Sequence, residues 1–217
     1  MKKFVCIMTL IGLTALSGTG SIFADNDDDD GPTAGLTKRN ANAIFAACKT
    51  AAQNTPSPLR GTSFTKMWCA VVDREGHLLL IRATDTGEEP GSVLNSDAWR
   101  GSIEIAIAKA YTGVAFSSND LALDSAQIGT LSQPGQALFG IGNTNPYRPL
   151  TGSRSLSPDD RRSQKHHGIV TFGGGEPVYN CATGDLLGAV GVSGDGVPQD
   201  VIVAEGAVTG AGFCLTP

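Results

Sequence analysis

The sequence has few of the residues that most often build metal and nucleotide sites. Only three histidines occur in 217 residues: His77, His166 and His167. The cysteines beyond the N-terminal region are too far apart for a Cys-x-x-Cys metal site, and no Gly-Lys-Ser/Thr follows the glycines at 173–175. Zinc sites built on Cys-x-x-Cys and phosphate-binding P-loops are therefore excluded.

Basic charge is also scarce. Lysine and arginine number 16 against 21 acidic residues, for a formal net charge of −5. Proteins that bind nucleic acid usually carry a clustered basic surface, so a phosphate-backbone partner is not expected. The segment Gly191-Val192-Ser193-Gly194-Asp195 lacks the Gly-x-Ser-x-Gly spacing of a nucleophile turn, which argues against a hydrolase of that type.

The N-terminus has the three-part order of a secretory signal. Lys2 and Lys3 precede an apolar run over residues 4–16, and a small, polar stretch leads to Ala24. The run is shorter than the roughly 20 apolar residues that a membrane span needs. We therefore expect residues 1–24 to be a cleaved signal peptide, a periplasmic or secreted location, and no membrane insertion afterwards.

An acidic, low-complexity segment follows at residues 25–35. It contains four consecutive aspartates, at 27–30, and almost no apolar residue, so we expect a disordered leader. The remaining residues 36–217 are enough for one domain with a sizeable core.

The four cysteines left after signal cleavage are Cys48, Cys69, Cys181 and Cys214. In an oxidising compartment they allow two disulfides in any of three connectivities. The pairing Cys48–Cys214 with Cys69–Cys181 is attractive, because Cys48 and Cys214 lie near the first and last predicted helices. Buried free thiols are the alternative.

Apolar periodicity predicts an α+β domain. A helix capped by Thr37 runs to about residue 55, and a β-hairpin covers residues 67–72 and 77–81. Helices are expected from Ser96 or Asp97 to Phe116 and over residues 121–128, followed by a long irregular stretch at 133–167. Strands at 169–172, 176–180 and 186–192 and a helix opening at 198–200 complete an antiparallel sheet flanked by helices.

Three segments together resemble one known family. They are the hairpin at 70–79, the alanine-rich helix at 102–113, and the glycine-rich stretch from Gly168 to Asp195. Their order and spacing are similar to those of the GlcG/HbpS family, whose relatives include the C-terminal domain of PduO-type proteins. The resemblance implies a profilin-like fold, homo-oligomers and, in several members, bound haem.

Imidazole is the most common protein ligand of haem iron, so the three histidines are the candidate metal ligands. His77 begins a strand after a turn, where a sheet-edge histidine needs no function. His166 and His167 end the long loop beside Arg161, Arg162 and Lys165, and the competing interpretation is a solvated basic loop. Because adjacent side chains in an extended segment point opposite ways, at most one of the pair is expected to face a given site.

Lys109 and Thr112 are further candidates for haem binding. They lie three residues apart on one face of the alanine-rich helix. The lysine can pair with a propionate and the hydroxyl can donate a hydrogen bond, although an exposed lysine and a helix-facing threonine are the commoner situation. The small residues of this helix and Gly188, Gly191 and Gly194 suit either a flat ligand or close packing of backbone.

Three functions are consistent with these observations. The first is an exported haem- or tetrapyrrole-binding protein for scavenging, buffering or sensing. The second is an enzyme or accessory subunit acting on a small organic acid, aldehyde or alcohol, with Lys109 and the histidines as acid/base or anion-binding groups. The third is a structural assembly module without a ligand.

Overall fold

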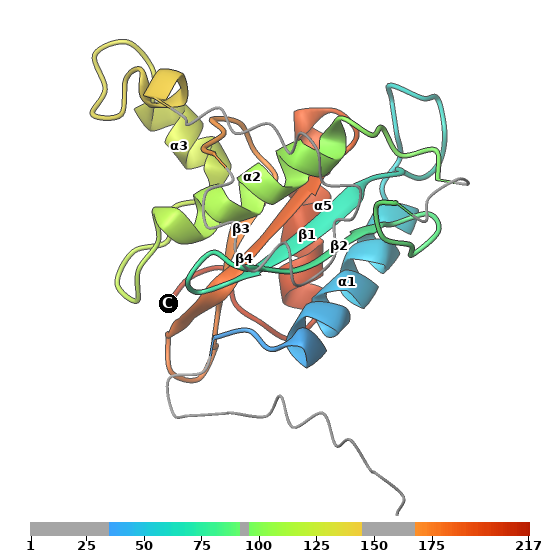
Figure 1. The fold of residues 1–217 in the computed structure, drawn as a ribbon, viewed down its shortest axis with the longest axis horizontal. Helices are drawn as coiled ribbons and strands as arrows, with labels where there is room; N and C mark the ends of the chain where they lie inside the picture. Colours follow the sequence, from blue (N-terminus) through green and yellow to red (C-terminus); the bar gives the residue numbers. More distant parts are fainter. Residues whose placement is uncertain (1–34, 92–95, 145–167) are drawn as a thin grey trace, which may run out of the picture. The chain divides into compact units, whose positions relative to one another are not determined.

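The computed structural model describes residues 35–91, 96–144 and 168–217, and in this part of the chain a four-stranded antiparallel sheet is covered by helices on both faces. The strands are β1 (Trp68–Asp73), β2 (Leu78–Ala83), β3 (Gly175–Tyr179) and β4 (Leu186–Ser193), in the spatial order β2-β1-β4-β3. The helices are α1 (Lys38–Gln53), α2 (Ser102–Ala115), α3 (Ser125–Leu131) and α5 (Val197–Gly210), with a 3-10 turn at Ile141–Thr144 (Figure 1). The predicted α+β class with an antiparallel sheet is confirmed.

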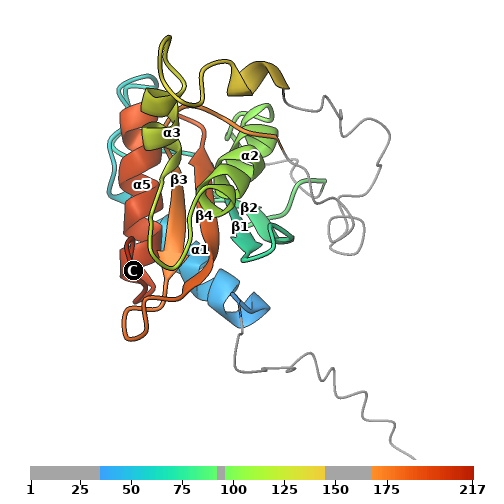
Figure 2. The same cartoon turned by 90° about the vertical axis from the view of Figure 1, so that its left-hand side faces the viewer.

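Two separate cores follow from the alternation of side chains along the strands. Cys69, Val71, Val190 and Val192 pack with α1 and α5, whereas Trp68, Ala70, Val72 and Ala189 pack with α2. Figure 2 shows α5 and α2 on opposite sides of the strands. The sheet is thus buried on both faces, which explains why β1 and β4 are apolar almost throughout.

Glycines in the sheet let α2 approach the strands closely. A Cβ added to Gly191 would lie 2.0 Å from the carbonyl oxygen of Ala106, and one added to Gly175 would lie 2.2 Å from that of Lys109. Side chains at these positions would push the helix away. The sequence left two interpretations of the glycine-rich strand, binding of a flat ligand or close packing of backbone. At Gly191 the glycine serves the packing of α2 on the sheet.

Several local predictions are confirmed. Thr37 caps α1 in a reciprocal pair with Asn40, and the hairpin turn has Gly76 at φ +83. Residues 176–179 and 186–192 lie in β3 and β4, and Pro198 lies in the first turn of α5. Within the described residues no helix is long and apolar enough to cross a membrane.

Three predicted boundaries are wrong. Helix α2 starts at Ser102 rather than near residue 96, because Asp85 accepts hydrogen bonds from the Ser96 hydroxyl and the Asp97 amide and holds that segment as a loop. The short helix begins at Ser125, capped by Asp124, rather than at residue 121. Residues 169–172 form no strand, since the Val170 amide donates to the Thr112 hydroxyl at 3.0 Å instead of to a neighbouring strand.

The favoured cysteine pairing is also wrong. The sulfur atoms of Cys181 and Cys214 lie 2.10 Å apart, at bonding distance, because the chain after α5 returns to pair Cys214 with Tyr179 at the end of β3. Cys48 and Cys69 are buried free thiols that face each other from α1 and β1. Burial, followed by the hydrogen bond with Cys69, raises the pKa of Cys48 well above its usual range.

The predicted signal peptide and nearly all of the acidic leader lie outside the described residues.

Candidate functional site

The predicted site residues fall into two separate regions of the described structure. Lys109 and Thr112 lie on α2 beside β3, and His77 lies in the turn between β1 and β2. His166 and His167 are outside the described residues. Lys109 and Thr112 thus share a helix face as expected, but His77 is held in a different environment.

Lys109 is fully buried and forms an ion pair inside the protein. Its Nζ lies 2.6 Å from Asp200 Oδ2 and donates to the carbonyl of Val192 at 2.9 Å. The ammonium also lies 5.0 Å from the centre of the Phe172 ring. Burial lowers the pKa of Lys109 and raises that of Asp200, and the attraction between the two charges opposes both shifts.

The glycines before β3 make room for this lysine. A Cβ on Gly174 would lie 2.8 Å from that of Asp200 and 2.9 Å from Lys109 Nζ. Gly174 also has φ +107, which side chains rarely adopt. The glycine run that the sequence suggested as a turn therefore lets a helix on one face of the sheet reach a helix on the other. The contact of Lys109 with Asp200 fixes the junction between β4 and α5.

The Thr112 hydroxyl also forms its hydrogen bonds within the protein. It donates to the carbonyl of Ala108 at 2.7 Å and accepts from the Val170 amide at 3.0 Å. Both Lys109 and Thr112 are 0% exposed beneath residues 168–175. Ligand contact by either residue stays a prediction, and it would require this covering segment to move.

A third buried group, Glu176, was not singled out from the sequence. It lies on β3 and is 5% exposed. Burial, and then the negative charges of Asp124 and Glu205, raise the pKa of Glu176 to about 8. The signal in the sequence is a charged residue in an otherwise apolar strand. A carboxyl that stays neutral at pH 7 is compatible with this apolar setting.

The described residues contain no cluster of three or more His, Cys, Asp or Glu side chains that could hold a metal ion.

Of the candidate ligands within residues 35–91, 96–144 and 168–217, His77 is the one that is partly exposed. Its side chain is 19% exposed, and its Nδ1 lies 3.1 Å from Asp73 Oδ2 and 3.7 Å from Glu75 Oε2. Asp73 Oδ1 accepts hydrogen bonds from the backbone amides of Glu75 and His77, both at 2.9 Å. One aspartate therefore shapes the turn and orients the ring. Both carboxylate contacts are to Nδ1, which leaves Nε2 as the nitrogen available to a metal.

The turn itself is held against α2. Gly76 is so close to Tyr111 that a Cβ there would lie 2.9 Å from two ring carbons. The exposed Arg74 directly follows β1, in the same turn. An imidazole oriented by Asp73, the Tyr111 ring and the exposed Arg74 therefore all lie near this turn.

The model of a family described as "haem degrading protein HbpS-like" matches residues 36–209. The chain belongs to the HbpS-like family. The resemblance drawn from the three sequence segments is confirmed.

This chain has relatives in Citrobacter freundii and Salmonella typhimurium. It is 34% identical over 139 residues to the "uncharacterized 15.0 kDa protein in dhaT-dhaS intergenic region" of Citrobacter freundii, covering 64% of this chain and 71% of that protein. It is 27% identical over 188 residues to the corrinoid adenosyltransferase PduO of Salmonella typhimurium, covering 84% of this chain. The chain spans about half, 48%, of the length of that PduO.

Solved structures of similar fold include the following two. The Klebsiella pneumoniae protein ORFY is 26% identical with a TM-score of 0.57, over 85% of this chain and 95% of that one. The structure of a PduOC:heme complex is 23% identical with a TM-score of 0.55, over 84% of this chain and 99% of that one. The latter supports the fold assignment of this HbpS-like chain.

Proposed function

We propose that this chain is an exported haem-binding protein in which the imidazole of His77 would hold the haem iron. The observation that carries the proposal is the orientation of His77 by Asp73 at an accessible turn of an HbpS-like domain. The description of the family and the haem complex of PduOC, which shares the fold, support haem as the ligand class.

The residues at this turn fit such a group. Histidines that bind metals usually present one ring nitrogen to the metal and the other to a carboxylate or carbonyl, which fixes the ring. Asp73 contacts Nδ1 of His77 in this way. Arg74 in the same turn is exposed and would provide a cation for a haem propionate. A bound haem would supply an iron centre able to bind small ligands and exchange electrons.

The setting of this function is part of the same proposal. The predicted signal peptide supports a location in the periplasm or outside the cell, where the protein would scavenge, buffer or sense haem. The close sulfur atoms of Cys181 and Cys214 are consistent with a disulfide formed in that compartment. Because His77 is partly exposed at the end of the sheet, a haem held by it would lie on the outside of the domain or between copies in a homo-oligomer.

Titration of the haem-free protein with haemin, followed at the Soret band, tests the proposal. We expect a saturable spectral change, and His77→Ala is expected to weaken haemin binding by roughly tenfold or more. The matched variant replaces His166 and His167 with alanine and is expected to retain binding. Folding of each variant is checked by its thermal midpoint.

The outcomes separate the parts of the proposal. A saturable change that survives His77→Ala but is lost in the His166→Ala, His167→Ala variant would overturn the assignment of His77 and keep haem binding. No saturable change in the native protein would overturn haem binding itself. A stable oligomer without haem affinity would then favour the assembly module, and turnover of a small acid or aldehyde would favour the enzymatic alternative.

A further inference from the structure

Two cysteine thiols that the proposed function does not use meet in the core between α1 and β1. Cys48 lies on the buried face of α1 and Cys69 lies on β1, and both are 0% exposed within the same hydrophobic cluster. The two thiols share a hydrogen bond. Thiols in hydrogen-bond contact need to approach by no more than about 2 Å to reach the sulfur–sulfur distance of a disulfide.

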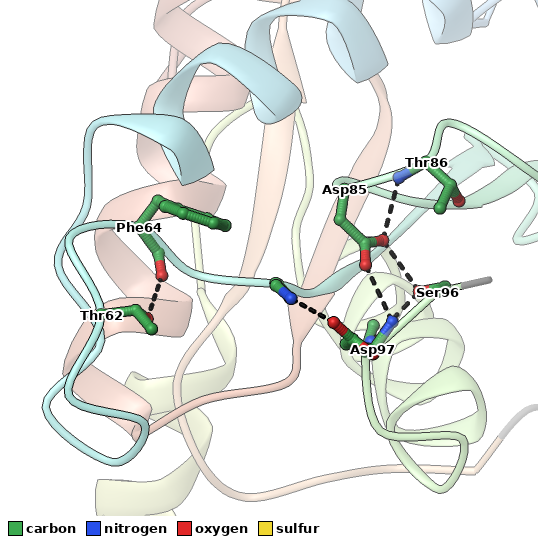
Figure 3. A network of polar contacts seen from close by, with 8 residues as sticks. Thr62, Phe64, Asp85, Thr86, Ser96 and Asp97 are labelled. Carbon is green, nitrogen blue, oxygen red and sulfur yellow. Dashed lines mark hydrogen bonds and ion pairs between the residues drawn. The ribbon is translucent and has the colours of Figure 1, made fainter.

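Hydrogen bonds at the end of α1 hold the helix and the strand together near these cysteines. The Thr65 amide and hydroxyl both donate to the carbonyl of Ala52, at 3.0 and 3.2 Å. Each of these two anchor residues lies four positions from one of the cysteines. The loop that joins α1 to β1 has a further bond of its own, because the Thr62 hydroxyl donates to the Phe64 carbonyl at 2.7 Å (Figure 3). The fold therefore brings these two thiols together by local bonds that involve no other cysteine.

The other cysteines of the described residues, Cys181 and Cys214, are at bonding distance from each other, which leaves Cys48 and Cys69 as the free thiols of that part of the chain. We propose that Cys48 and Cys69 form an oxidisable dithiol, which a disulfide-bearing oxidant converts into a second disulfide that ties α1 to β1.

The oxidation proceeds by two exchange steps. One cysteine attacks the disulfide of the oxidant, which forms a mixed disulfide and releases the first thiol. The second cysteine then attacks the protein sulfur of the mixed disulfide and releases the other thiol. The two electrons pass to the oxidant, which leaves as two thiols carrying the two cysteine protons.

Burial sets the conditions for this oxidation. The thiolate is the attacking form, and burial raises the pKa of Cys48 well above its usual range. Neither Cys48 nor Cys69 is exposed to an oxidant in the folded protein. The oxidant therefore meets the pair while the chain folds or when α1 separates from the sheet. We expect slow oxidation of the folded, reduced protein and fast oxidation during refolding.

Mapping of disulfide-linked tryptic peptides tests the proposal. Trypsin places Cys48 in the peptide of residues 40–49 and Cys69 in that of residues 67–74, whereas Cys181 and Cys214 share one peptide. The full chain is refolded from its reduced, denatured state in mixtures of reduced and oxidised glutathione, and free thiols are blocked before digestion. We expect the first two peptides to be linked to each other and to separate in dithiothreitol.

Two results of this mapping would overturn the proposal. One is recovery of both short peptides unlinked at every glutathione ratio. The other is a link from either of them to the peptide that contains Cys181 and Cys214. In the variant Cys181→Ala, Cys214→Ala the link between the short peptides is expected to persist, and its loss in a folded variant would contradict direct pairing.

Thermal unfolding gives a second readout. Dithiothreitol is expected to lower the thermal midpoint of the oxidised native protein by about 5–10 °C more than that of the variant Cys48→Ala, Cys69→Ala. The reason is that only the native protein loses a link across a loop of about 20 residues. Equal shifts in the two proteins would show that no such link forms. None of these results depends on haem binding, which the haemin titration tests separately.

Discussion

The two halves of the sheet differ in the state of their polar groups. One half is formed by β3 and β4 (the β3 side) and the other by β2 and β1 (the β2 side). On the β3 side, Lys109, Thr112 and Glu176 are all buried, and the first two are hydrogen-bonded to other parts of the chain. On the β2 side, His77 is partly exposed and the Trp68 indole has no partner among the described residues. Buried and satisfied groups stabilise the fold, whereas accessible or unsatisfied groups are those to which a ligand can add an interaction.

The largest effect is expected at the buried ion pair. Lys109→Met leaves the Asp200 carboxylate buried without its cation, so we expect a loss of about 3–5 kcal/mol in the free energy of unfolding. Adding Asp200→Leu should restore much of this loss, because no buried charge then remains. Urea denaturation measures both. The matched control is Lys49→Met on α1, for which little change is expected.

The same variants also test whether the residues of the β3 side only stabilise the fold or bind haemin. If the β3 side is structural, Lys109→Met with Asp200→Leu should fold and bind haemin as the native protein does. A loss of stability below about 1 kcal/mol for Lys109→Met, together with a loss of haemin binding, would instead make Lys109 a ligand residue.

The next effect is a dependence of stability on pH that comes from Glu176. Its pKa is about 8 in the folded protein and near its ordinary value in the unfolded chain. A raised carboxyl pKa means that the folded state holds its proton longer, so this group's contribution to stability falls as pH rises from about 4.5 to about 8. The fall amounts to a few kcal/mol and levels off above that range.

Glu176→Gln tests this contribution. We expect the variant to be more stable than the native protein at pH 8 and to flatten the decline between pH 5 and pH 8, as measured by denaturant unfolding at each pH. Glu88→Gln, at an exposed position, is the control and should leave the slope unchanged. An identical slope in the Glu176→Gln protein would show that Glu176 ionises normally.

The smallest effect is expected on the β2 side, at Asp73. Asp73→Asn keeps an oxygen that can accept the two turn amides but removes the negative charge next to His77 Nδ1. We expect unchanged folding and a loss of haemin affinity of up to roughly tenfold, measured by Soret titration. An affinity equal to that of the native protein would mean that Asp73 serves only the turn.

The sequence predicted the elements whose signals are local. Thr37 with a periodic apolar face specifies α1, and the apolar runs around residues 73–76 specify the hairpin. The capping pair of Asp124 and Gln127 was also a local signal for α3, but it was not recognised. Local signals therefore account for most of the fold.

The buried ion pair depends on a contact between distant residues, so it could not be predicted from the sequence. Lys109 lies off the apolar stripe of its helix and is nevertheless buried, because Asp200 supplies a counter-charge 91 residues away. The absence of side chains at Gly174 and Gly175 opens the path between them. His77 was identified from its residue type, but its orientation by Asp73 became visible only in the folded turn.

The most direct test of where the ligand binds is the broadening of backbone amide signals by haemin, whose ferric iron is paramagnetic. Binding at His77 predicts that broadening is strongest at residues 73–78 and around Tyr111, with the amides of Val192 and Asp200 retained. Broadening centred on residues 170–175 and the start of α5 would contradict the assignment of the β2 side as the ligand-binding side.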